Sequence, residues 1–519
     1  MAETSEDGMK RTLGLTGLTI NAMALIAPGA FLWTTFQSQA LQSNGGHTTA
    51  FDMVPGLLFA LLLAFLTAWS YSELSDLYPD AGAGSSYYFA QAAFLEREEA
   101  FHYRFARLAK FVVGWISHLY YWIYPGIMVA FSGTLVVYIL GLFGITLTTP
   151  FEILAAVLFA ILTGLIAFRG IVASTMTAVV INVIQLTALV AFSVLAIVFR
   201  LAHPELAYAQ HDVAAVVLPH NVMNVLFQGT IAILLLVGFE SVTALGAEAV
   251  NPRRDIRRAI LLSLAIQGGL AYILEYVSAN LFVNSGVTAQ VTGAGGRVST
   301  VGGYAAAAAS SAPIGDMVRF IGDTMLGGTG LVLSLILAVT VLVALTGTTL
   351  ACLNSGVRIT YVMGRDREVP GILGLLHGRY ATPHYGILAL AAISALLGAY
   401  GVLSADNLLQ IILAANAGTF LVYGMTNAIV VVAFWHRAER SALRHVVIPG
   451  IGLLANLAML AAVVFLSFSG GGSTQSDTLI ALGIVAAWIV VGVAWLLTNS
   501  RSSRRSLLVR SVADRGAAS

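Results

Sequence analysis

The chain reads INAMALIAPGAF over residues 20–31, where an apolar helical segment runs into a helix breaker. Pro28 has no backbone N–H and its ring clashes with the preceding turn, while Gly29 accepts unusual dihedral angles. A second stretch, LVGFESV over residues 236–242, places a glycine directly before Phe239 and the acidic Glu240. Taken singly, such breaks are typical of a proline kink and a packing glycine in membrane helices.

The composition around these stretches is that of a membrane protein. Of 519 residues, 58% are hydrophobic and only 10% are charged. A soluble domain carries about 25% charged residues, so this chain lacks the means to cover a water-facing surface. A net charge of +1 argues against a nucleic-acid partner, and the single cysteine, Cys352, excludes a disulfide framework. Residues 1–8 lack the basic segment of a cleavable leader.

Hydropathy predicts the number of membrane crossings. A bilayer core of about 30 Å needs roughly 20 apolar residues in a helix, and helices satisfy their own backbone in lipid. We therefore expect an all-α polytopic membrane protein with twelve transmembrane helices. They lie at residues 13–34, 53–71, 111–140, 153–168, 171–199, 223–245, 259–282, 331–353, 385–402, 408–435, 446–468 and 479–497.

The basic residues predict the orientation of these spans. With the N-terminus inside, all of the 26 lysines and arginines except Arg200, Arg297 and Arg319 fall on the cytoplasmic side. Cytoplasmic loops of membrane proteins carry such an excess. We expect a multi-pass protein of the cell (inner) membrane with both termini in the cytoplasm.

The two interrupted spans are the first and the sixth. A separation of five spans predicts two five-helix repeats of opposite topology followed by two further helices, since paired breaks in two halves mark a transporter site. Residues 82–93 are expected to form a short helix along the membrane surface. The predicted organisation is a cytoplasmic tail at 1–12, repeats at 13–199 and 223–435 separated by an external loop at 200–222, a flexible external loop at 284–325, helices eleven and twelve at 436–499, and a basic cytoplasmic tail at 500–519.

Three ionisable side chains lie within the spans: Glu240, Glu275 and His118. A charge at a helix centre costs about 2.5–3.5 kcal/mol on insertion scales, so each needs a partner or a function. All three are candidates for proton coupling, and Glu240 is the strongest because it sits at a break. Glu275 is equally explained as a neutral acid bonded between helices, and His118 is more typical of a satisfied interhelical histidine.

Further polar and aromatic groups have two readings each. Residues 120–124, YYWIY, either line a cavity, with Tyr124 in the binding site, or pack in the core. Thr346, Thr348 and Thr349 could supply oxygens to a sodium ion, although threonines more often bond back to their own helix. We expect no other metal site and no cofactor.

Four stretches carry a family resemblance. They are AWSYSEL at 68–74 followed by Tyr78-Pro79, GFES at 238–241 followed by NPRRDI at 251–256, MGRD at 363–366, and Thr382-Pro383. Together they resemble the amino acid–polyamine–organocation superfamily.

The resemblance implies a LeuT-type inverted-repeat fold, alternating access and a solute site between the first and sixth helices. In this chain the matching positions are Ala27, Pro28, Gly29 and Ala30 with Gly238, Phe239, Glu240 and Ser241. Family members often have Gly-Ser-Gly at the first break. The proline found here removes a donor for a carboxylate.

These observations predict a secondary transporter, and not an enzyme, that moves an amino acid or a related amine or polyamine. A protonated amine is the natural partner of Glu240. Proton coupling or exchange is favoured, and a sodium-coupled symporter is the alternative. A membrane enzyme would need clustered catalytic groups, and a channel would need a filter motif. The oligomeric state stays open.

Overall fold

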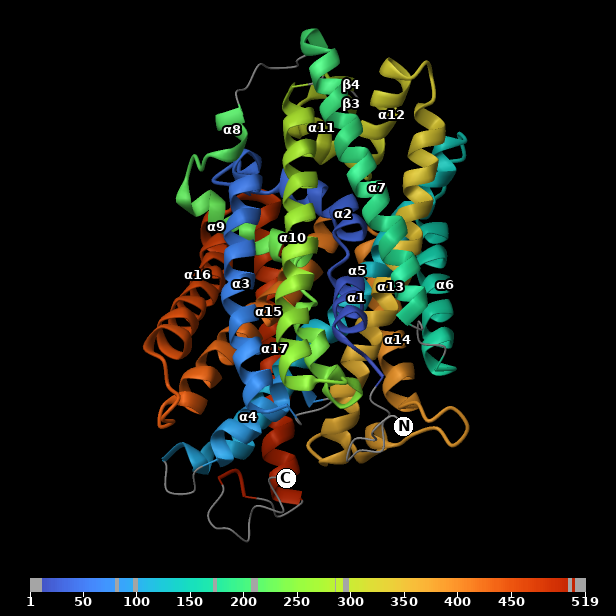
Figure 1. The fold of residues 1–519 in the computed structure, drawn as a ribbon. Coiled ribbons are helices and arrows are strands. Elements are labelled where there is room, and N and C mark those ends of the chain that lie inside the picture. The colour runs from blue at the N-terminus through green and yellow to red at the C-terminus, as the bar shows by residue number, and fades with distance from the viewer. Residues whose placement is uncertain are drawn as a thin grey trace.

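The structure is a computed structural model that describes residues 12–79, 84–96, 101–170, 175–206, 213–284, 286–292, 298–502 and 506–508. Helices make up nearly all of it, in the form of one elongated bundle (Figure 1). The start of α1 and the end of α17 lie at the same end of the bundle, drawn at the bottom of Figure 1 and here called the lower end. Most of the expected tails at 1–12 and 500–519 falls outside the described residues.

The spans are formed by the following helices. They are α1 (Leu15–Ile26) with α2 (Pro28–Leu41), α3 (Met53–Leu77), α5 (Ala106–Leu142), α6 (Thr149–Phe168), α7 (Thr175–Ala202), α9 (Val222–Ala232) with the 3₁₀ segments η5 (Ile233–Leu235) and η6 (Phe239–Glu248), α10 (Pro252–Asn284), α13 (Gly330–Arg365), α14 (His384–Gly401), α15 (Ala405–Phe434), α16 (Ile448–Ser469) and α17 (Gly472–Ser502).

The connections contain short elements. They are the strands β1 (Ser43–Asn44), β2 (His47–Thr48), β3 (Thr288–Thr292) and β4 (Val298–Gly302), the helices α4 (Ser86–Leu95), α8 (Val213–Val217), α11 (Tyr304–Ala309) and α12 (Pro313–Met325), and the single turns η1 (Ala50–Asp52), η3 (Phe101–Phe105), η4 (Pro204–Leu206), η7 (Gly371–Gly374) and η8 (Leu443–Val447).

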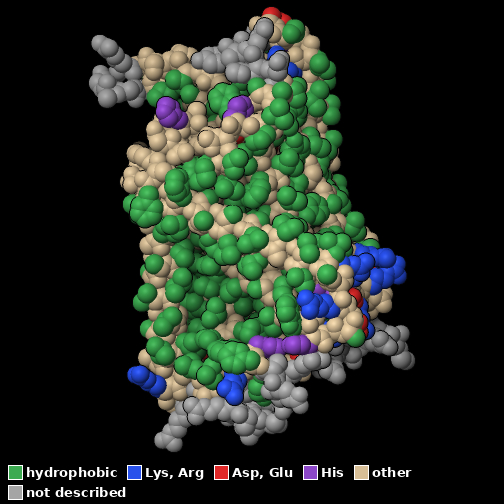
Figure 2. Space-filling model, turned by 90° about the vertical axis from the view of Figure 1, so that its left-hand side faces the viewer, with side chains coloured by type: hydrophobic (Ala, Val, Ile, Leu, Met, Phe, Trp, Pro, Cys, Tyr) green, Lys and Arg blue, Asp and Glu red, His purple; other side chains and the backbone are tan. Residues whose placement is uncertain are grey.

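The prediction of twelve spans is confirmed. Within the described residues, eleven helices are long and apolar enough to cross a membrane, and the bent pair Val222–Leu235 and Phe239–Gly246 makes a twelfth. Exposed leucines, isoleucines and valines cover the outer faces of α6, α7, α16 and α17. Figure 2 shows hydrophobic side chains over the middle of one face, with most basic side chains toward its lower end. Such a surface is suited to lipid.

Many helices extend beyond the spans that hydropathy predicts. The third span was expected at 111–140, and α5 begins at Ala106, directly after η3. The eighth was expected at 331–353, and α13 continues to Arg365. Hydropathy detects only the turns inside the hydrocarbon, whereas the backbone goes on as helix into polar turns that face water or other helices.

The expectation of a flexible loop over residues 284–325 is wrong as to its structure. β3 and β4 form an antiparallel hairpin, and α11 and α12 follow it. Residues 305–309 are all alanine, the residue type with the highest helix propensity. Pro313 occupies the first turn of α12, where proline is favoured. α11 packs against α2, so this segment covers the upper end of the first span.

The helix expected along the membrane surface at 82–93 is also corrected. α4 runs over Ser86–Leu95 and packs against α5 and α15, with Tyr87 and Phe89 each 1% exposed. The hydroxyls of Ser86 and Tyr71 hydrogen-bond over 2.7 Å. The apolar side chains of α4 are therefore largely buried against neighbouring helices.

An ion-pair network fastens the lower end of α5. Nε of Arg107 lies 2.9 Å from Oε1 of Glu368, and both side chains are 2% exposed. Nζ of Lys110 lies 2.6 Å from Oδ2 of Asp366. Arg107 also donates from Nη1 to the carbonyl oxygen of Ser506, over 2.9 Å. The loop after α13 and the chain beyond α17 are therefore both tied to α5.

Candidate functional site

The first span is interrupted at Ala27, which has φ 8° and ψ 67° and separates α1 from α2. Pro28 begins α2, and the amides of Ala30 and Phe31 both turn back to the carbonyl oxygen of Ala27, at 3.0 and 3.2 Å. Ala27, Pro28, Gly29 and Ala30 are buried. Because proline has no N–H, the first turn of α2 has few donors to offer an anion.

The sixth span is interrupted at Gly238, where the chain bends by 42° into η6. Gly238 has φ 128°, a conformation that side chains with a Cβ rarely adopt. A Cβ at this position would lie 2.3 Å from Cδ2 of Leu25 and 3.0 Å from the amide nitrogen of Ile26. The two breaks predicted from the sequence are therefore present, and their backbones touch.

The carboxylate of Glu240 lies directly after this break and is 1% exposed. Its Oε2 accepts hydrogen bonds from the Tyr423 hydroxyl and the Gly238 amide, each over 3.0 Å. Its Oε1 accepts from the hydroxyls of Tyr121 and Tyr120, over 3.2 and 3.3 Å. Four donors thus surround one buried carboxylate, an arrangement that stabilises negative charge without a cationic side chain.

Aromatic rings enclose this carboxylate. Tyr120 and Tyr121 come from α5, Tyr423 from α15, Tyr71 from α3, and Phe239 from the break itself. The Phe239 and Tyr423 rings are 5.4 Å apart, and Tyr71 meets each edge-on at 6.1 and 6.2 Å. We call these five residues, with Glu240, the tyrosine chamber. Its wall offers π faces and hydroxyl groups around one anion, a combination that suits a cation.

Two predicted binding residues face away from the carboxylate. The Tyr124 hydroxyl donates to Oδ1 of Asn416 over 2.9 Å, which favours the packing interpretation of this residue. A Cβ on Gly29 would meet Leu189 and Gln185 of α7, at 3.1 and 3.2 Å. At Gly29 the glycine therefore allows α2 to approach α7.

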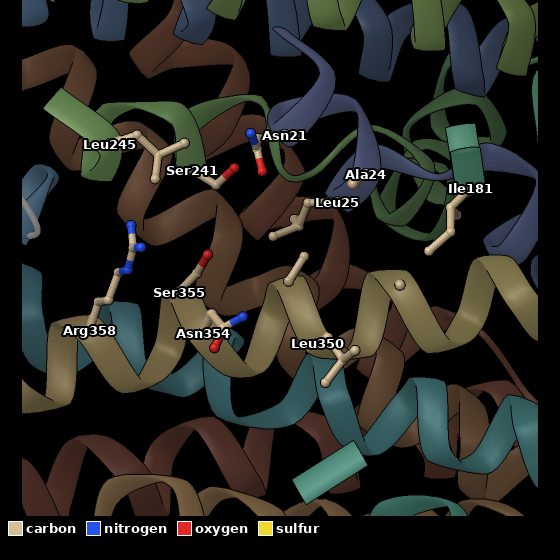
Figure 3. Close-up of a pocket in the computed structure, with 12 residues that line it drawn as sticks. Asn21, Ala24, Leu25, Ile181, Ser241, Leu245, Leu350, Asn354, Ser355 and Arg358 are labelled. Atoms are coloured by element: carbon tan, nitrogen blue, oxygen red, sulfur yellow. The ribbon is translucent and has the colours of Figure 1, made fainter. Parts of the chain in front are cut away.

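A small cavity lies beside the chamber, on the lower-end side of the breaks. It has a volume of about 90 Å³ and opens between α1, α7, η6 and α13. Figure 3 shows Asn21 and Ser241 on one side of it and Asn354, Ser355 and Arg358 on α13. Ser241 is thus a predicted site residue that lines a cavity. Pockets for small molecules occupy about 300–1,000 Å³, so this one is contracted.

Contacts at the lower end join the segments that line the cavity. Arg358 donates from Nη2 to Oε1 of Glu248 over 3.2 Å and from Nη1 to the carbonyl oxygen of Ala244 over 3.3 Å. The amide of Leu13 donates to the carbonyl oxygen of Glu248 over 2.9 Å, and the amide of Val250 returns a bond of 2.9 Å to Leu13. We call Arg358, Glu248 and this backbone pairing the lower gate.

The other two ionisable candidates lie apart from the chamber. Glu275 is fully buried on α10, and its Oε1 accepts a hydrogen bond from Nε2 of Gln39 on α2, over 3.0 Å. Nε2 of His118 lies 2.9 Å from Oγ1 of Thr360, and the ring packs against Trp122. His118 thus has the contacts of a satisfied interhelical histidine.

The threonines of α13 divide between two roles. Thr346 and Thr349 donate to the carbonyl oxygens of Leu342 and Leu345, one turn back on the same helix. Thr348 instead donates across to the carbonyl oxygen of Ala24 on α1, over 3.1 Å. Only Thr348 therefore joins α13 to the interrupted span.

Sequence reasoning missed Tyr120, Tyr121 and Tyr423 as partners of Glu240. The aromatic run at 120–124 offered Tyr120 and Tyr121 only as candidates to line a cavity, and nothing in the sequence pointed to Tyr423, which is 183 residues from the glutamate. It also missed Arg358, which lies on α13 just beyond the predicted eighth span at 331–353. Within the described residues, no group of three histidine, cysteine, aspartate or glutamate side chains could hold a metal ion.

Comparison with known proteins agrees with this architecture. The family model for amino acid permeases matches residues 22–509. The branched-chain amino acid permease BcaP of Bacillus subtilis is 25% identical over 96% of this chain and 95% of its own length. The low-affinity putrescine importer PlaP of Escherichia coli K12 is 23% identical over 96% of each chain, and the methylthioribose transporter of Bacillus subtilis is 21% identical over 88% of each. With nearly its whole length matched, the chain belongs to the amino acid permease family.

Proposed function

We propose that this permease moves an amine-bearing solute, a free amino acid or a small polyamine, through the tyrosine chamber by alternating access. The observation that carries the proposal is that the two oxygens of the Glu240 carboxylate accept hydrogen bonds of different length. Oε2 is anchored by Tyr423 and the Gly238 amide at 3.0 Å, whereas Oε1 accepts the two longer bonds from Tyr120 and Tyr121. An entering ammonium group can take the place of these longer bonds at Oε1.

The surroundings of Glu240 favour an amine over a lone carboxylate. Proline at position 28 removes a backbone donor that an anion would use, and two further amides are bonded to Ala27. The tyrosine rings supply π faces, which attract a desolvated cation by roughly 2 kcal/mol. Two of the relatives are named for branched-chain amino acids and for putrescine, which share a primary amine. If the solute is a neutral amino acid, groups other than the backbone amides around Pro28 bind its carboxylate.

We propose that the solute reaches the lower end through the 90 Å³ cavity once the lower gate opens. Glu248 and Arg358 separate in this step, and α1 moves away from the segment around Val250. In the cell membrane this end faces the cytoplasm, in keeping with the basic residues of the predicted inner loops. The Gly238 contact with α1 lets the two interrupted spans move as one unit.

Proton coupling is the driving force we propose, because the spans hold two buried glutamates and the sequence has no lysine within the predicted spans. A sodium-coupled symporter is the second candidate. One observation favours it: Thr348 brings a hydroxyl to the carbonyl oxygen of Ala24 at the interrupted span, and oxygen pairs of this kind suit hard cations.

The direct test is binding of labelled putrescine and labelled leucine to the purified protein. Glu240→Gln keeps the size of the side chain and removes its charge, so it should abolish binding of either amine while leaving the melting temperature nearly unchanged. Glu439→Gln is the matched control because this glutamate is 77% exposed. If Glu240→Gln binds both probes as tightly as the wild type across the pH range, the carboxylate is structural and the proposal is wrong.

A further inference from the structure

A second buried carboxylate, Glu275, has far fewer partners than Glu240. It lies on α10 and is 0% exposed. Oε1 accepts one hydrogen bond, from Gln39, and Oε2 has no partner among the described residues. An ionised carboxylate held by a single neutral donor in the interior is strongly disfavoured. The surroundings of Glu275 therefore do not provide for a negative charge.

Several side chains near Glu275 have oxygen atoms that accept no hydrogen bond from the described residues. Gln228 on α9 donates from Nε2 to the carbonyl oxygen of Gln39 over 2.9 Å and to the Thr49 hydroxyl over 2.7 Å, but its own Oε1 is unpartnered within the described residues. The same holds for Oε1 of Gln39 and for the hydroxyl of Ser278. Ser278 follows Glu275 by three residues, so both lie on one face of α10.

Among the described residues, this cluster has more acceptor oxygens than free donors. Three acceptor oxygens, on Gln39, Gln228 and Glu275, are fully buried and have no hydrogen-bond partner among the described residues, and the Ser278 hydroxyl can donate to only one of them. Buried polar groups are almost always satisfied, so each orphan needs an explanation. One proton on Oε2 of Glu275 removes the charge and at the same time creates an O–H donor for a neighbouring oxygen. Glu240, with four donors, has no such deficit.

We propose that Glu275, Gln39, Gln228 and Ser278 form the site of the coupling proton, apart from the tyrosine chamber that holds the solute. The inference rests on the proposed proton-coupled transport and assigns the two glutamates different tasks. Glu240 stays ionised and binds the amine, and Glu275 gains and releases the proton as the bundle alternates.

The helix α11, over Tyr304–Ala309, packs against α10 and α2, the two helices that carry Glu275 and Gln39. Tyr304 at the start of α11 is buried, and its hydroxyl has no partner among the described residues. Burial is the main cause that raises the pKa of this hydroxyl. Because α11 packs on α2, displacement of α11 opens a path from the upper end to the proton site.

Other titratable groups near the site are few. Asp52 is 1% exposed and accepts a hydrogen bond from the amide of His220, over 2.7 Å. The His220 ring lies 3.4 Å from the same oxygen. On α10 itself, Tyr272 and Tyr276 flank Glu275 in the sequence. Gln39 on α2 and Gln228 on α9 are neutral amides. Titration of the site therefore belongs chiefly to Glu275.

Infrared spectroscopy of the full-length protein in lipid tests the protonation without any solute. The wild type at neutral pH should show the carbonyl band of a protonated carboxylic acid, Glu275→Gln should lose it, and Glu240→Gln should keep it. Ser278→Ala, which is milder, should shift the band, while Ser334→Ala, a buried serine bonded to its own helix, should not. A band that survives Glu275→Gln unchanged, or that disappears when sodium chloride replaces choline chloride, overturns the proposal.

Transport then tests the coupling. In proteoliposomes, Glu275→Gln should lose the acceleration of labelled putrescine or leucine uptake by an inward proton gradient, yet retain exchange against the unlabelled solute. Retention of full gradient-driven uptake overturns the assignment. Should the wild type carry neither probe, the proposed function fails at that point, and the infrared result still decides the protonation site.

Discussion

A Cβ atom on Gly238 would lie 2.3 Å from Cδ2 of Leu25, so the interrupted first and sixth spans meet where no side chain has room. The backbone at Gly238 also has φ 128°, which an alanine adopts only under strain. Both facts concern the hinge between two broken helices, and they make this glycine more critical than any other in the site.

Gly238→Ala should therefore abolish uptake and lower the free energy of unfolding by about 1–3 kcal/mol, the usual strain of such a backbone conformation. Labelled-solute uptake and thermal unfolding measure the two effects. Gly269→Ala on α10 is the control, because a Cβ there meets nothing within 4 Å. Normal transport by Gly238→Ala would show that the contact with Leu25 is not required.

The lower gate can be weakened by a single substitution. Arg358→Gln breaks the pair with Glu248, whose side chain is 29% exposed, and such partly exposed pairs contribute about 0.2–1 kcal/mol. The gate should then open up to about fivefold more often. A cysteine at Ser241, which lines the cavity, should react correspondingly faster with a polar thiol reagent. The natural Cys352 is 1% exposed and gives a low background.

The buried pair Arg107–Glu368 should respond far more strongly. Glu368→Gln leaves the guanidinium, 2% exposed, without its anion, and removing one partner of a buried pair costs about 3–5 kcal/mol. Denaturant unfolding in detergent should register this loss. Glu439→Gln, whose carboxylate is 3.9 Å from Arg437 and 77% exposed, should change stability by less than about 0.5 kcal/mol. Equal losses of stability in the two variants would contradict the conclusion that the Arg107–Glu368 pair stabilises the fold more than the exposed pair does.

Asp316 on α12 gives a pH-dependent prediction. Burial raises the pKa of its carboxyl above the ordinary value, although a hydrogen bond from Ser310 and the charge of Arg319 oppose the shift. A raised pKa in the folded state means that the stabilisation is complete in acid and is lost as the pH rises through the ordinary and then the folded value. Asp316→Asn should therefore raise the melting temperature at neutral pH but not in strong acid. An equal gain at both pH values would exclude titration as its cause.

The sequence predicted the structure correctly where a single residue determines the local backbone conformation. Pro28 and Gly238 marked both breaks, and hydropathy located the spans, because helix breaking and insertion depend on neighbouring residues alone. Glu240 was the leading candidate from the sequence because an acid within a membrane helix needs a partner or a function, and its role stays a prediction.

Contacts between distant segments could not be found in this way. Gln39 and Glu275 are 236 residues apart, and nothing local to either predicts their hydrogen bond. The ring of tyrosines required knowing which faces of α5 and α15 meet. The hairpin and helices over 284–325 were missed because small residues are compatible with both loops and tightly packed elements.

The bond from Arg107 to the carbonyl oxygen of Ser506 has a practical consequence for anyone producing this protein. The same guanidinium forms the ion pair with Glu368. The chain just past α17 is therefore bonded to the side chain that also connects α5 with the loop after α13. A fluorescent protein or a purification tag fused immediately after residue 508 would disturb the hydrogen bond between Arg107 and Ser506. A long polar spacer, or a fusion at the other terminus, leaves it intact.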